Sequence, residues 1–280
     1  AFRRITIIML TESFMIWAFL VALFLCPLCS LLGVFVTSRR MSFFGETIAH
    51  GAIGGVAIGI FLGLANPTPA VVGFSFLIAA ALLWLKENSE LATDTIMALL
   101  LSGSISFGML LLSLMKGNFS GDIHRILFGD ILAVGPQDVI IAAALLIVIS
   151  VLIFTRLSQL TLLSAQEELA HVCGVRVRRL NYLFVLALTL TVAISVRLVG
   201  ILLVTPMLVI PAASARNISV NLRQQIIFSL VIGIVGGLAG VAVAYHLDAP
   251  CGPAIVMTCV GIFIITLIAR PLALNSKPAK

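Results

Sequence analysis

Apolar residues recur along this 280-residue chain in runs that short polar or charged connections separate. Each run holds roughly 20 residues, which is enough for a helix to cross the hydrocarbon core of a bilayer. The pattern predicts an all-α, polytopic transmembrane helix bundle with eight to nine spans. We place nine candidate spans at 14–37, 44–65, 69–85, 92–115, 137–155, 180–197, 199–216, 224–246 and 253–270.

Composition agrees with this pattern and excludes a soluble protein with a polar surface. Hydrophobic residues make up 61% of the chain and charged residues 10%, and the mean hydropathy is +1.23. The first run ends at Arg39 and Arg40 instead of a small-residue cleavage site, so we interpret it as a span and not as a signal peptide. We expect one transmembrane domain over 1–280, with a long hydrophilic segment at 156–179 on the cytoplasmic side.

The net charge of +6 reports membrane topology and does not indicate nucleic-acid binding, because the basic residues occur singly or in pairs between apolar runs. The positive-inside rule then predicts an external N-terminus and an internal C-terminus. The basic residues expected at the cytoplasmic surface are Arg39, Arg40, Lys86, Arg156, Arg176, Arg178, Arg179, Arg216, Arg223, Arg270, Lys277 and Lys280.

Glu46 and His50 lie four residues apart in the second run, so one helix face presents both. Ionisable groups at membrane depth are costly and indicate function. A rise of ~1.5 Å per residue from Arg40 puts Glu46 about 9 Å and His50 about 15 Å deep. A carboxylate and an imidazole one turn apart can bind one divalent metal ion, and imidazole suits zinc and other transition metals. The pair predicts a transient metal site on a transport path, with a buried, mutually hydrogen-bonded Glu–His pair as the alternative.

Small residues recur every fourth position in the same run and again near the C-terminus, a spacing that lets helices approach closely in lipid. We predict packing roles for both sets. The first set is Thr47, Gly51, Gly55, Gly59 and Gly63, and the second is Gly233, Gly237, Gly236 and Gly240.

Other polar residues are weaker metal candidates. His246 and Asp248 fall at the expected external end of a span, where they would help to receive the metal, and an incidental surface pair is the alternative. His124 with Asp122 forms a similar, weaker pair. His171 is expected to be solvated or in contact with a partner. Cys26 and Cys29 share a helix face, but thiols within apolar spans are generally packing residues.

Residues 166–174 predict a short cytoplasmic helix, with Glu167 and Glu168 in its first turn and Gly174 at its end. Such a helix between two spans suits the docking of a partner, although an ordinary solvated connection has the same pattern. The sequence has no G-x-x-x-x-G-K-[ST] motif, so we expect no ATPase site and no enzyme activity of its own. Active transport then needs another subunit or an ion gradient.

Four segments in order resemble the membrane subunit of bacterial zinc and manganese ABC importers, and especially the zinc-uptake permease. The segment 39–50 (RRMSFFGETIAH) resembles R-R-M-x-x-x-G-[DE]-x-x-x-H, and 127–134 (LFGDILAV) is similar to L-F-G-x-[IL]-L-A-V. The segment 200–216 resembles G-x-L-L followed by I-P-A-x-x-A-R, and 248–253 (DAPCGP) resembles D-x-P-x-G-P. The family usually has Asp where this chain has Glu46, which puts the metal geometry in question.

The resemblance implies a homodimeric permease in the bacterial plasma (inner) membrane. It also implies a cytoplasmic ATP-binding subunit, an extracytoplasmic metal-binding protein and surrounding membrane lipid as partners. Zn²⁺ would be the transported substrate, and no permanently bound cofactor is expected. Glu168, Ala170 and Gly174 then match the E-A-A-x-x-x-G coupling loop that docks on the ATPase, with Glu167 beside them.

Two alternatives stay open. In the first alternative, the same importer carries Mn²⁺ or Fe²⁺, since zinc sites and manganese sites both use His and carboxylate ligands. A stand-alone secondary transporter would instead exchange protons at Glu46 and His50, but it needs no dock for an ATPase. A purely structural membrane protein does not explain the Glu–His pair.

Overall fold

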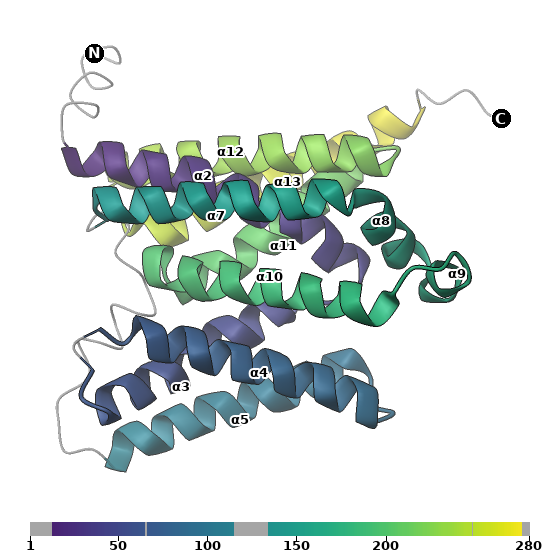
Figure 1. The fold of residues 1–280 in the computed structure, drawn as a ribbon. Coiled ribbons are helices and arrows are strands. Elements are labelled where there is room, and N and C mark those ends of the chain that lie inside the picture. Colours follow the sequence, from purple (N-terminus) through teal and green to yellow (C-terminus); the bar gives the residue numbers. More distant parts are fainter. Residues whose placement is uncertain (1–12, 65, 115–133, 248, 276–280) are drawn as a thin grey trace. The chain divides into compact units, whose positions relative to one another are not determined.

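The computed structural model describes residues 13–64, 66–114, 134–247 and 249–275, and Figure 1 shows its helices. No strand occurs among these residues, so the predicted all-α class is confirmed. The described helices are α2 (Ser13–Ser38), α3 (Phe44–Phe61), α4 (Thr68–Asn88), α5 (Thr93–Leu114), α7 (Pro136–Thr155), α8 (Leu157–Ala165), α9 (Glu167–Val172), α10 (Val177–Val199), α11 (Ile201–Ile218), α12 (Leu222–Leu247) and α13 (Cys251–Asn275).

Nine helices in the described part of the chain are long and apolar enough to cross a membrane. They coincide with the nine predicted spans, and most of their ends lie within three residues of the predicted ones. The second span is shorter than predicted, because α3 ends at Phe61 and not at residue 65. Gly63, which has a φ of +65°, ends it: the N–H of Leu64 donates to the Gly59 carbonyl over 3.0 Å. Gly63 therefore terminates the helix and is not part of the packing stripe.

Two compact units make up the chain, and the prediction of a single domain over 1–280 stays a prediction. The first unit comprises Ala1–Val34, Asp130–Thr155 and Pro206–Lys280, and the second comprises Phe35–Gly129 and Arg156–Thr205.

Glycines of α12 hold the first unit together, as predicted. A Cβ placed on Gly237 would lie 2.5 Å from the Cys26 sulfur of α2, and one on Gly236 would lie 2.5 Å from the Cys259 sulfur of α13. The Ser229 hydroxyl of α12 also donates to the Ser30 carbonyl of α2 over 2.9 Å. Two glycine stripes on one helix thus receive two neighbouring helices, and Cys26 is a packing residue here.

In the second unit, α3 lies between α4 and α5 and also contacts α10 (Figure 1). A Cβ on Gly55 would lie 2.6 Å from the Val71 Cα of α4, and one on Gly108 of α5 would lie 2.9 Å from the Gly54 nitrogen. The Thr47 hydroxyl is 3.3 Å from the Met97 carbonyl of α5. These backbone approaches fix how α3 is rotated, and so they determine which of its residues stay uncovered.

Gly55→Ala should lower the free energy of unfolding by about 1–3 kcal/mol, because the added methyl group meets the backbone of α4 and not a side chain that can rotate away. Thermal unfolding of the purified protein in detergent measures the change. Gly73→Ala is the matched control, since nothing lies within 4 Å of a Cβ at that helical position. Equal unfolding temperatures of the two variants would contradict the backbone contact.

Candidate functional site

The turn before α3 sets the start of the helix that carries Glu46 and His50. α2 ends in a turn in which the N–H of Met41 donates to the Val36 carbonyl over 2.9 Å, and Arg40 has a φ of +54°. α3 then begins at Phe44, so Glu46 lies in its first turn. A carboxylate at this end of a helix interacts favourably with the helix dipole.

Glu46 and His50 lie close together but are not hydrogen-bonded to each other. His50 Nε2 is 4.0 Å from Glu46 Oε1, which is too long for a hydrogen bond. No hydrogen bond of either side chain occurs among the described residues. This geometry disagrees with the alternative of a mutually hydrogen-bonded pair, and it leaves the lone pairs of both groups open to a ligand.

The pair lies on a partly uncovered stripe of an otherwise buried helix. The Glu46 side chain is 39% exposed and the His50 side chain 26%, whereas their neighbours Thr47, Ile48 and Ala49 are fully buried. Ile53, one turn beyond His50, is also only partly covered. The glycine contacts of α3 with α4 and α5 therefore leave the Glu–His face open.

The separation of the two side chains suits a shared metal ion after a small rearrangement. Zinc lies about 2.0–2.2 Å from histidine and carboxylate ligands, so tetrahedral coordination requires the two ligand atoms to lie about 3.4 Å apart. The observed 4.0 Å exceeds this by an amount that a side-chain rotation removes. No group of three or more His, Cys, Asp or Glu side chains suited to a metal occurs in the described part of the chain.

The predicted depth assumed helical rise from Arg40, whereas residues 39–43 form a turn, so the depth of the pair in a membrane stays a prediction. Counted from Phe44, Glu46 is about 3 Å and His50 about 9 Å along an axis of about 27 Å. His50 is thus about one third of the way along α3, and Glu46 lies at the end predicted to face the cytoplasm.

Arg39 links the end of α2 to α10, a role that sequence reasoning missed when it assigned this residue to topology alone. Its guanidinium donates to the Asn181 side-chain oxygen and lies 4.9 Å from the centre of the Phe184 ring. Phe184 in turn packs edge-on against Phe35, with ring centres 6.4 Å apart. The partners are more than 140 residues away in sequence, so no local pattern signals them.

The remaining metal candidates are not gathered around Glu46 and His50 by any described contact. His246 is exposed in the last turn of α12, and Asp248 lies outside the described residues, as do His124 and Asp122. His171 is exposed on α9.

Residues 167–172 form the short helix α9 that the sequence predicted. Gly174 has a φ of +75°, its N–H donates to the His171 carbonyl over 3.1 Å, and the N–H of Val175 donates to the Ala170 carbonyl over 3.0 Å. This pair of bonds is the helix ending that favours glycine, so the prediction that Gly174 terminates the helix is confirmed. The preceding residues, predicted only as a hydrophilic segment, form the additional helix α8, whose Leu160 and Leu163 are buried.

α9 exposes apolar side chains as well as polar ones. Val172 is 85% exposed and Leu169 49%, whereas Ala170 is fully buried. The side chains of Glu167 and Glu168 lie outside the described residues. Sequence reasoning selected the glutamates and missed Leu169 and Val172, although apolar residues in a short hydrophilic loop were a usable signal.

An ion pair joins α4 and α10 close to α9. Arg178 donates to both Glu87 oxygens, over 2.9 and 2.7 Å, and its guanidinium lies 5.8 Å from the centre of the Tyr182 ring. These residues line a cavity of about 400 Å³ together with Lys86 and His171. α9 thus borders a recess that Leu82, Leu83 and Val185 line together with these polar side chains.

Known proteins are similar to this chain over nearly its whole length. Residues 11–270 match the model of the ABC 3 transport family. The chain belongs to this family. It is 32% identical over 254 residues to the high-affinity zinc uptake system membrane protein ZnuB of Haemophilus influenzae, covering 90% of this chain and 96% of that protein.

Manganese permeases are nearly as similar. The manganese import system permease protein ScaB of Streptococcus gordonii is 30% identical over 254 residues, covering 91% of this chain and 90% of that protein. The structure of PsaBC from Streptococcus pneumoniae in complex with Fab has a TM-score of 0.84 and 29% identity, and the match covers 98% of both chains. The expected family, permease subunits of zinc and manganese ABC importers, and the multi-pass inner-membrane location are thereby confirmed. Identity to the two kinds of relative does not separate the two metals.

Arg39→Gln should lower the free energy of unfolding by about 1–3 kcal/mol, because it removes a charge-assisted hydrogen bond and the cation–ring contact with Phe184. Unfolding in detergent measures this loss. Arg40→Gln removes the same charge from an exposed neighbour and should change the stability by no more than about 0.5 kcal/mol. An equal loss of stability in both variants would mean that the contacts of Arg39 with Asn181 and Phe184 do not stabilise the protein.

Proposed function

We propose that this chain is the membrane permease subunit of an ATP-driven importer of Zn²⁺, in which Glu46 and His50 bind the ion transiently during its passage. The observation that carries the proposal is an imidazole and a carboxylate 4.0 Å apart on the open face of a membrane helix, in a member of the ABC 3 transport family.

A transient site is what a transport path requires. An ion must bind well enough to enter and weakly enough to leave, so two protein ligands supplemented by water suit a path better than a closed cage of four. The imidazole of His50 and the similarity to a zinc uptake protein favour Zn²⁺ as the substrate. Mn²⁺ is the second candidate, since the carboxylate of Glu46 and the manganese permeases support it. Fe²⁺ is a third candidate for the transported ion.

The energy for transport would come from partner subunits that hydrolyse ATP. On this proposal two permease copies pair with cytoplasmic ATP-binding subunits, receive metal from an extracytoplasmic binding protein, and hold no resident cofactor or ATPase site. His246, with Asp248, would help to receive the ion outside. The segment from Glu167 to Gly174 would dock on the ATPase, and its support is the exposed apolar pair Leu169 and Val172 beside the two glutamates. A proton-coupled secondary transporter has no use for such a surface.

His50→Ala should abolish zinc uptake and leave membrane insertion unchanged, because it removes the nitrogen ligand while the contacts of α3 with α4 and α5 remain. Uptake of radioactive zinc by cells or proteoliposomes carrying the complete transporter measures the loss. His246→Ala is the comparison variant and should reduce uptake far less, because His246 would only help to receive the ion and is not one of the two proposed path ligands. Normal zinc uptake by the His50→Ala variant would rule the site out.

Val172→Asp should weaken association with the ATPase and reduce metal-stimulated ATP hydrolysis by roughly tenfold or more, because a charge replaces the more exposed of the two apolar side chains proposed to dock. Co-purification and the hydrolysis rate of the reconstituted complex measure both effects. Val220→Asp, at another exposed valine predicted to face the same side, should change neither. If Val172→Asp left both ATPase association and metal-stimulated hydrolysis unchanged, residues 166–174 would be an ordinary connection between two spans. That result would favour the secondary transporter.

A further inference from the structure

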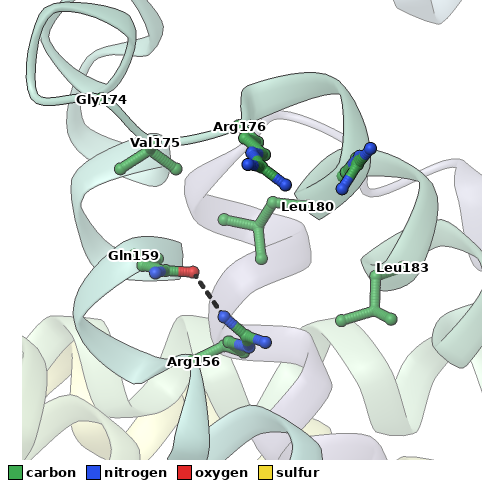
Figure 2. A pocket seen from close by; sticks show the side chains of 8 residues that line it. Arg156, Gln159, Gly174, Val175, Arg176, Leu180 and Leu183 are labelled. Carbon is green, nitrogen blue, oxygen red and sulfur yellow. Dashed lines mark hydrogen bonds between the residues drawn. The ribbon is translucent and has the colours of Figure 1, made fainter.

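Three arginines line one cavity in the second unit. Arg156, Arg176 and Arg179 surround a volume of about 370 Å³, and the rest of the lining comes from Gln159, Gly174, Val175, Leu180 and Leu183. Figure 2 shows Arg156 and Gln159 on one side of this space and Arg176, Leu180 and Leu183 along α10 on the other. The volume lies within the range of roughly 300–1,000 Å³ that is typical of ligand pockets.

The cavity lies where membrane-spanning segments reach the surface. Arg156 directly follows the last residue of α7, and Arg176 directly precedes the first residue of α10; both helices are candidate spans. Leu183 is seven residues beyond Arg176, or about 10 Å further along α10 toward the hydrocarbon region. The lining therefore changes from cationic at the surface to apolar at depth.

The positive charges of this cavity have no counter-charge among the side chains that the structure describes. Arg156 donates only to the neutral Gln159 oxygen, over 3.4 Å, and no carboxylate pairs with Arg176 or Arg179. The adjacent Arg178 differs, since Glu87 binds it over 2.7 Å. The three arginines are exposed and their guanidinium groups lie around one open recess, so an anion bound among them would reduce their mutual repulsion.

We propose that this cavity binds the phosphodiester headgroup of an anionic phospholipid of the cytoplasmic leaflet. The arginines hold the phosphate, and Leu183, which is 38% exposed, contacts the first part of an acyl chain, next to the buried Leu180. Basic pockets at the cytoplasmic ends of membrane helices are known to bind anionic lipid headgroups, and this recess lies at the start of the membrane helix α10. An acidic segment of a soluble partner fits the charge but not the apolar lining, which runs into the span. Because Gly174 borders the cavity, the lipid would brace the α9 segment.

Native mass spectrometry of the full chain in mild detergent tests this proposal, with phosphatidylglycerol and phosphatidylcholine as the probes. The wild type should bind phosphatidylglycerol in preference to phosphatidylcholine, and Arg176→Gln with Arg179→Gln should weaken that binding by about thirtyfold. The control pair Arg216→Gln with Arg223→Gln makes the same charge change at exposed positions predicted on the same side. It should leave binding within about twofold of the wild type.

Arg176→Lys with Arg179→Lys keeps the charge and should restore part of the binding, which separates loss of the headgroup site from loss of folding. The proposal is wrong if the control pair weakens binding as much, or if phosphatidylcholine binds as tightly as phosphatidylglycerol. It is also wrong if inorganic phosphate displaces the lipid completely, which would indicate a site for a free anion. Unchanged phosphatidylglycerol binding in the Arg176→Gln, Arg179→Gln variant would likewise overturn it. None of these outcomes depends on zinc uptake.

Discussion

Lipid gives apolar helices no hydrophobic reason to associate, so the helices of this protein associate where small residues let their backbones come close. Gly55 places α3 directly against α4, and Gly108 of α5 places α5 directly against α3. Gly236 and Gly237 do the same for α12 against α13 and α2. Such contacts admit only one rotation of each helix. The exposed position of Glu46 and His50 follows from this rotation, because the faces of α3 that carry small residues are the faces that become buried.

Polar interactions then act where the helices end. Arg39 ties the end of α2 to α10, and Arg178 ties α10 to Glu87 at the end of α4. Both arginines lie beside residues predicted to face the cytoplasm, where a docked ATPase would act. Arg178 is largely exposed, so its ion pair adds little stability of its own, whereas the Phe184 ring shields Arg39. Within the second unit, glycine contacts thus hold the helices together along their length, and arginine contacts hold them together at their ends.

The sequence predicted the nine spans well, because each is a long apolar run with a polar boundary, and this signal is local. It also predicted the shared face of Glu46 and His50, which depends only on helical periodicity. It missed α8, whose buried leucines alternate with polar residues over too short a segment to stand out. It could not predict the pairing of Arg39 with Asn181, since tertiary contacts between distant residues leave no trace in one sequence. The rise counted from Arg40 does not apply, because α3 begins only at Phe44, and the depth of Glu46 in a membrane stays a prediction.

The central claim is that Glu46 and His50 bind the transported ion, and X-ray absorption spectroscopy of the zinc-loaded transporter tests it most directly. The account predicts nitrogen and oxygen ligands at about 2.0–2.2 Å, with imidazole scattering that disappears in the His50→Gln variant. Sulfur ligands at about 2.3 Å, or imidazole scattering that persists in the variant, would contradict it.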